Sequence, residues 1–142
     1  MTLSVGVIGT GVMGAEHVRI LREETAGARV VAVCDADAER ARAVAGDGEA
    51  FTDPLALIHD HKVQAVVIAS PDATHADLAL ACLAAGKPVL CEKPLAATAD
   101  QALRVVQAEV TLGKRLVQVG YMRRFDPAYV EMLRVRQSGA IG

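Results

Sequence analysis

The chain has 142 residues and a mass of 14.9 kDa, a size that predicts one globular domain. Its composition, 52% hydrophobic and 23% charged, excludes a disordered protein, and a net charge of −2 gives no general attraction to nucleic acid or acidic membranes. The sequence has no apolar run of membrane-spanning length and no signal-peptide pattern, and its three cysteines form no CxxC pair, so we expect a cytoplasmic protein with reduced thiols.

Short apolar runs alternate with helical patterns over the first 120 residues. The first half of the chain is expected to hold a strand over 3–8, a helix opened by glycines, a strand over 29–33, a helix over 37–45, a weak strand near Phe51 and a helix over 53–60. A strand over 65–69, a helix that Gly86 ends and a strand over 89–91 are expected next. The last elements are a helix with one apolar face (Ala99, Ala102, Leu103, Val106 and Val110), a strand over 116–119 and a helix over 126–138. Strands that are apolar throughout are typical of sheets covered on both faces. The pattern therefore predicts an α/β fold, a doubly wound and mostly parallel Rossmann sheet followed by a C-terminal helix.

A glycine loop lies between the first strand and the first helix. Gly9, Gly11 and Gly14 form G-x-G-x-x-G, with Thr10, Val12 and Met13 between them. The spacing alone is a weak indication, but its place between strand and helix favours a dinucleotide site. Gly9 would permit a tight turn, Gly11 would let the backbone approach a pyrophosphate, and Gly14 would let helix and strand pack closely. The helix start would offer free N–H groups to the phosphates. The alternative is a helix-entry turn without a ligand.

An acidic residue, Asp35, follows the second strand, 26 residues after Gly9. In a dinucleotide site this carboxylate would accept hydrogen bonds from the adenosine ribose and would repel a 2′-phosphate, by up to about 4 kcal/mol at about 4 Å and an effective dielectric of about 20. Positions 36–38 hold no arginine, although Arg40 is near. We therefore predict NAD as the cofactor, with NADP disfavoured. The alternative is a solvated acid at a strand end.

Methyltransferases that bind S-adenosylmethionine also pair a glycine loop with an acid after the second strand. Their loops usually read G-x-G-x-G, without a third glycine at the spacing found here. This alternative is therefore disfavoured.

A second motif, Glu92-Lys93-Pro94, follows the strand over 89–91. Ligands of doubly wound folds bind outside the carboxyl ends of the strands, and the proline holds Lys93 extended. An ammonium there could hydrogen-bond a substrate hydroxyl and stabilise alkoxide charge as hydride leaves. The alternative is an ordinary solvated loop lysine.

These motifs together resemble a known family, the glucose–fructose oxidoreductase, inositol dehydrogenase and rhizopine-catabolism (Gfo/Idh/MocA) oxidoreductases. The resemblance covers essentially the whole chain, and its last segment, residues 120–126, looks most similar to the inositol-dehydrogenase-like branch. The matching segments are the glycine loop, the turn Ser70-Pro71-Asp72-x-x-His75, the run 85–96 around Glu92-Lys93-Pro94, and residues 120–126, which read Gly-Tyr-Met-Arg-Arg-Phe-Asp.

The resemblance implies an NAD(P)-dependent oxidation of a secondary hydroxyl on a cyclitol or sugar, or the reverse reduction. It implies that Lys93 contacts the reacting hydroxyl and that Glu92 lies by the nicotinamide ribose. The remaining implied site residues are Ser70, Pro71, Asp72, His75 and Pro94 on the cofactor side, and Arg123 and Arg124 on the substrate side. Some members have a cis peptide before this proline, so we expect a cis Lys93–Pro94 bond.

The chain is about half as long as members of that family, whose second domain supplies further catalytic residues and most subunit contacts. We therefore expect residues 1–123 to be an NAD-binding Rossmann domain and residues 124–142 to lead to a C-terminal substrate domain that is absent. Such a chain would bind NAD without catalysing substrate oxidation by itself, and the full-length protein would be a homo-oligomer. The alternative is a stand-alone NAD-sensing or partner-binding protein.

The remaining polar and apolar clusters suggest no further chemistry. His59-Asp60-His61 is expected to be a solvated turn, so we predict no metal, and Cys34, Cys82 and Cys91 are expected to be buried thiols. The aromatic residues near the C-terminus either form an exposed apolar patch that promotes self-association or fold back onto the core.

Overall fold

A computed structural model describes residues 2–141 and shows one six-stranded sheet, all of whose strand pairs are parallel. The strands are β1 (Leu3–Ile8), β2 (Ala28–Cys34), β3 (Glu49–Phe51), β4 (Ala65–Ile68), β5 (Val89–Glu92) and β6 (Val117–Gly120). Their order across the sheet is β3-β2-β1-β4-β5-β6. This is the strand order of the dinucleotide-binding Rossmann fold, and it confirms the predicted fold class.

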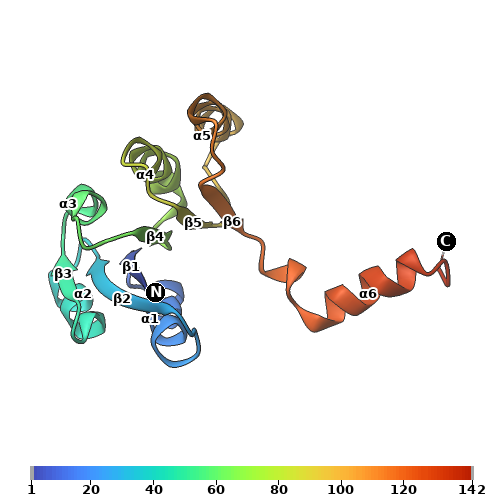
Figure 1. Cartoon of the computed structure of the whole chain (residues 1–142), viewed down its shortest axis with the longest axis horizontal. Helices are drawn as coiled ribbons and strands as arrows, with labels where there is room; N and C mark the ends of the chain where they lie inside the picture. Colours follow the sequence, from blue (N-terminus) through green and yellow to red (C-terminus); the bar gives the residue numbers. More distant parts are fainter. Residues whose placement is uncertain (1, 142) are drawn as a thin grey trace.

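Helices cover both faces of the sheet (Figure 1). They are α1 (Val12–Glu23), α2 (Ala38–Ala45), α3 (Pro54–His59), α4 (Asp72–Ala84), α5 (Ala99–Leu112) and α6 (Pro127–Gln137), with a short 3₁₀ helix, η1 (Met122–Arg124), before the last. Helices α1 and α2 lie on one face, whereas α3, α4 and α5 lie on the other (Figure 1).

Residues of the central strands β1, β2 and β4 contribute to two separate apolar cores. On the α1–α2 side, Val7 and Val33 pack with Val18 of α1. On the other side, Ile68 and Cys91 are fully buried among the side chains of α3, α4 and α5. Because central strands are buried on both faces, their sequences read as continuous apolar runs.

Local signals in the sequence set several helix ends. Asp37 caps α2 by accepting hydrogen bonds from the amides of Glu39 and Arg40, at 3.0 and 3.1 Å. Asp126 caps α6 in the same way, with Pro127 in its first turn. Gly86 follows α4 with a φ of +67°, a conformation that favours glycine. These ends agree with the sequence predictions.

The face of α5 predicted from its apolar spacing is not the buried one. Val105 is its fully buried residue, whereas Leu103, Val106 and Val110 are exposed. Val106 and Val110 border a groove of about 1040 Å³ whose floor includes Val67 and Leu90. Within residues 2–141 no element covers the sheet at this groove. The apolar spacing of α5 therefore identified an apolar helix face that no part of residues 2–141 covers.

Helix α6 does not fold back onto the sheet. It extends away from β6 beyond η1 (Figure 1), and none of its residues is buried. Tyr121, Phe125, Tyr129 and Met132 are exposed by 55%, 78%, 44% and 56%, so the structure has the exposed apolar patch rather than the folded-back helix. No helix within residues 2–141 combines the length and apolarity needed to cross a membrane.

Candidate coenzyme-binding site

The glycine loop brings β1 and the start of α1 close together. Gly9 has a φ of +88°, and a Cβ built there would lie 2.5 Å from the Ser70 amide nitrogen, so a side chain is excluded twice over. A Cβ on Gly14 would collide with the Gly9 carbonyl oxygen. A Cβ on Gly11 would meet nothing within 4 Å. The loop therefore packs tightly against the protein at two glycines and opens to solvent at the third.

The start of α1 is free of side-chain capping. Gly11 is the N-cap residue and provides no side chain, and the first turn contains no acidic residue. The first N–H groups of a helix lack partners inside the helix and carry the positive end of its dipole. Val12 and Met13, exposed by 90% and 50%, leave this end accessible, as an anion-binding site requires.

Asp35, at the end of β2, holds the glycine loop. Its Oδ2 accepts hydrogen bonds from the Thr10 amide at 2.8 Å and from Thr10 Oγ1 at 3.1 Å. Its Oδ1 accepts from the Asp37 amide at 3.0 Å and from Arg40 Nη1 at 3.3 Å. Burial acts to raise the pKa of Asp35, but these hydrogen bonds and the Arg40 charge outweigh it, so the pKa lies below its usual value. The carboxylate is therefore ionised and oriented at neutral pH.

A cleft of about 860 Å³ runs along the carboxyl ends of β1, β2 and β4. Seven of the predicted site residues line it: Gly9, Gly11, Val12, Met13, Asp35, Ser70 and Pro71. Arg40, Thr74 and Asp77 also line it and were not among the predicted site residues. The cleft thus joins the glycine loop, the acid after β2 and the turn after β4.

Other predicted residues lie next to the cleft without lining it. Thr10 and Gly14 form its supporting loop, and Asp72 begins α4. His75 is 1% exposed, and its ring lies between two backbone carbonyls: Nδ1 lies 2.6 Å from the Pro94 carbonyl oxygen and Nε2 lies 2.8 Å from that of Ser70. His75 therefore ties the loop after β4 to the loop after β5.

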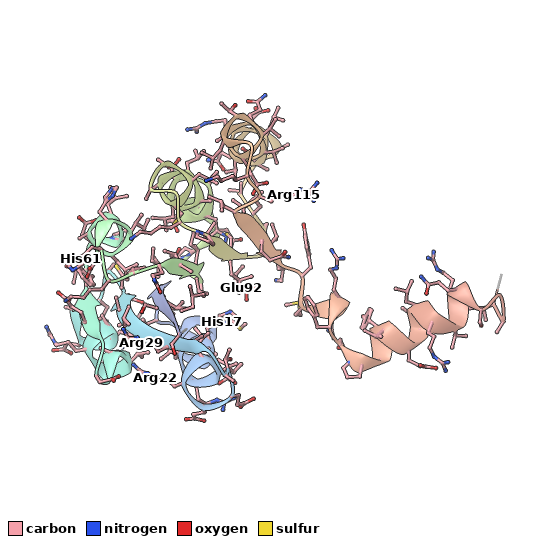
Figure 2. The ribbon with its side chains drawn as sticks, in the orientation of Figure 1. His17, Arg22, Arg29, His61, Glu92 and Arg115 are labelled. Carbon is pink, nitrogen blue, oxygen red and sulfur yellow. The ribbon has the colours of Figure 1, made fainter. Side chains whose placement is uncertain are left out.

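The Glu92-Lys93-Pro94 motif lies at the carboxyl end of β5. The Lys93–Pro94 bond is cis, as predicted. Lys93 is exposed, and within residues 2–141 its ammonium makes no hydrogen bond or ion pair. Glu92 instead pairs with a residue that was not predicted to take part in the site: His17 Nε2 of α1 lies 2.8 Å from Glu92 Oε1 (Figure 2).

The two predicted substrate-side arginines lie in η1, beyond the end of β6. Arg123 donates to Asp126 Oδ2 at 2.7 Å, and its guanidinium lies 5.0 Å from the centre of the Tyr129 ring. Arg124 is exposed. Neither arginine lines the cleft, and their part in substrate binding stays a prediction.

The three thiols are buried, as predicted. Burial raises the pKa of Cys34 to about 11, with Asp35 adding to the effect, and raises the pKa of Cys82 and Cys91 to about 12 each. Such thiols are inert at neutral pH. Among the described residues no three His, Cys, Asp or Glu side chains come together as a metal site would require.

The strand order, the uncapped glycine-rich helix start and the oriented acid after β2 define a dinucleotide-binding Rossmann domain. Comparison with known proteins supports the same class. The sequence profile of the Gfo/Idh/MocA oxidoreductase family, described by its NAD-binding Rossmann fold, matches residues 3–121. The chain belongs to this family.

Individual relatives and solved structures show similarity to inositol dehydrogenases. The chain is 64% identical over 146 aligned positions to inositol 2-dehydrogenase 1 of Saccharopolyspora erythraea and 55% identical over 142 to the inositol 2-dehydrogenase of Rubrobacter xylanophilus. It also resembles the solved structure of Lactobacillus casei myo-inositol dehydrogenase in complex with NAD(H) and myo-inositol, with a TM-score of 0.95 and 38% identity. These alignments cover 100%, 99% and 100% of the chain, but only 43%, 41% and 43% of the respective relatives.

Two links at the site were missed by the sequence reasoning. Arg40 was noted only as a nearby charge, and its place in the first turn of α2, where Asp37 begins the helix, turns it back toward Asp35. His17 was not among the predicted site residues. It lies three residues after Gly14 and four before Leu21, on the side of α1 that faces the sheet. This spacing could have predicted that His17 faces the sheet.

Proposed function

We propose that these residues form the coenzyme-binding domain of a dehydrogenase that transfers hydride between NAD and a secondary hydroxyl of a cyclitol, myo-inositol being the first candidate. The observation that carries the proposal is the open space at Gly11. This space lies at the uncapped start of α1, in the same cleft as the ionised Asp35. The names of the inositol 2-dehydrogenase relatives support the choice of substrate class.

The residues present fit NAD. The backbone at Gly11 and the first amides of α1 would hold the pyrophosphate, because no side chain intervenes there. Asp35 would hold the adenosine ribose by exchanging its long 3.3 Å contact with Arg40 for a ribose hydroxyl. Its negative charge opposes a 2′-phosphate, although Arg40 offsets part of that effect, so we propose NAD in preference to NADP.

Lys93 is the proposed catalytic residue of this domain. NAD, when bound, supplies the hydride-accepting chemistry. Lys93 extends from the carboxyl end of β5 with an ammonium that has no partner among residues 2–141, so it is free to donate a hydrogen bond to a substrate hydroxyl and to stabilise alkoxide charge there. His75 anchors the loop that carries Lys93, because it binds the carbonyl of the next residue, Pro94.

We further propose that residues 1–123 form this domain and that residues 124–142 connect it to a substrate domain, where Arg123 and Arg124 would border the substrate. The relatives extend well beyond the matched region, which supports such an arrangement. By this proposal the 142 residues bind NAD but do not oxidise the substrate at a useful rate, since substrate positioning comes from elsewhere.

Turnover tests the proposal. The 142-residue chain is assayed for NADH formation from NAD and myo-inositol, beside a chimera that joins it to the C-terminal part of the Saccharopolyspora erythraea relative. We expect turnover only in the chimera, and a loss of about 10²–10⁴-fold on Lys93→Met but not on Lys114→Met. NADH formation by the 142-residue chain would contradict its incompleteness. A folded chimera that binds NADH without turnover would contradict the assigned reaction.

A further inference from the structure

Helix α1 carries a histidine that reaches across to the end of β5. His17 Nε2–H donates to Glu92 Oε1 at 2.8 Å, and Figure 2 shows the two side chains pointing toward one another. The side chains are only 21% and 15% exposed, so the contact is largely shielded from solvent. A charge-assisted hydrogen bond in such a setting holds its partners more firmly than a surface ion pair does.

The carboxylate lies beside β6 at a position that carries no side chain. Glu92 pairs in register with Gly120, and a Cβ built on Gly120 would lie 3.2 Å from Glu92 Oε2. Any other residue at position 120 would press on the carboxylate. Within residues 2–141, Oε2 itself makes no hydrogen bond. His17 therefore holds one oxygen of Glu92, and Gly120 leaves room for the carboxylate, while the other oxygen stays available to a ligand.

The position of this pair assigns it to one half of the coenzyme site. A dinucleotide lies across the carboxyl ends of the strands with its pyrophosphate at the glycine loop between β1 and α1. Asp35 marks the adenosine half on the β2 side, so β4, β5 and β6 mark the nicotinamide half. Glu92 ends β5 and immediately precedes Lys93.

We propose that His17 is a positioning residue for the nicotinamide half of the site: it holds the Glu92 carboxylate so that Oε2 faces a hydroxyl of the nicotinamide ribose. This inference rests on the proposed NAD binding and adds to it a residue of α1. It predicts that loss of His17 weakens contacts with the nicotinamide end of the coenzyme and spares those with the adenosine end.

Ligands that carry only one end of the coenzyme separate the two ends. The 142-residue chain is titrated with NADH, with ADP, which lacks both the nicotinamide ring and its ribose, and with NMNH, which lacks the adenosine half. We expect His17→Ala to weaken NADH and NMNH binding by about tenfold and to leave the affinity for ADP within about twofold. His17→Gln keeps an N–H donor and should recover much of the loss. His61→Ala, at a histidine whose side chain is 90% exposed, is the matched control and should change neither affinity.

A double-mutant cycle tests whether His17 acts through Glu92. In the Glu92→Ala background, His17→Ala should cause no further loss of NADH affinity, because the carboxylate that it positions is gone. Thermal unfolding of each variant checks that the fold is kept. Additive losses, equal losses for NADH and ADP, or no loss for NADH would each overturn the inference. If the wild-type chain bound ADP but not NADH, this inference would fail and the adenosine half of the proposed site would be kept. Binding of neither ligand would overturn the proposed function as well.

Discussion

The carboxylate of Asp35 accepts two hydrogen bonds from Thr10, one from its amide at 2.8 Å and one from its hydroxyl at 3.1 Å. An acid that sequence reasoning assigned only to ribose binding thus also fixes the glycine loop. The two tasks use the same group, so one substitution should affect both coenzyme selectivity and loop stability.

Coenzyme selectivity should depend on the charge of Asp35. In Asp35→Asn the repulsion of a 2′-phosphate is removed while Arg40 remains, so the ratio of NADPH to NADH affinity should rise by about tenfold. Parallel titrations with the two coenzymes measure this ratio. Asp47→Asn, at a side chain that is 96% exposed, serves as the control. An unchanged ratio in Asp35→Asn would remove the basis for preferring NAD.

The unfolding free energy should depend on pH through the ionisation of Asp35. Its pKa in the folded chain lies below the ordinary value of 3.8, so ionised Asp35 stabilises the fold above that pH, and the contribution is lost as pH falls toward the lower folded value. The difference in unfolding free energy between wild type and Asp35→Asn should therefore be constant near neutrality and shrink below about pH 4. Urea unfolding at several pH values measures it; a difference that grows on acidification would have the wrong sign.

The glycines of the loop should separate folding from binding. Gly14→Ala places a Cβ against the Gly9 carbonyl and should lower the unfolding free energy by about 3 kcal/mol. Gly11→Ala meets no protein atom, so it should fold as stably as wild type yet bind NADH at least about tenfold more weakly. Chemical unfolding and NADH titration of both variants test this contrast. Full NADH affinity in Gly11→Ala would show that the coenzyme does not approach there.

His75 should matter for stability more than its place beside the cleft suggests. His75→Ala removes both contacts to the Ser70 and Pro94 carbonyls inside a fully buried site, which should cost about 2–4 kcal/mol in unfolding free energy. His61→Ala should cost less than about 0.5 kcal/mol. Urea denaturation provides the comparison, and similar values for the two variants would contradict the bridging role.

Much of this fold could be predicted because local rules and tertiary packing agree. The glycine spacing, the apolar run over β4 and the cap at Asp37 each point to the element that forms. The cis Lys93–Pro94 bond was expected only from the family resemblance, since nothing in the local sequence demands it.

What could not be predicted depends on partners distant in sequence. Apolar spacing placed Val106 and Val110 on one face of α5, but it could not predict that within residues 2–141 this face borders an open groove. Similarly, Glu92 and His17 are 75 residues apart, and their contact follows from the packing of α1 against the sheet. Pair contacts of this kind arise from topology, which no local pattern contains.

The most direct test of the account is a titration of the purified 142-residue chain with NADH, followed by nicotinamide fluorescence. We expect saturable binding of one NADH per chain, weakened at least about tenfold in Gly11→Ala without loss of the fold. No fluorescence change and no heat of binding with either NADH or NAD, from a chain shown to be folded, would contradict it.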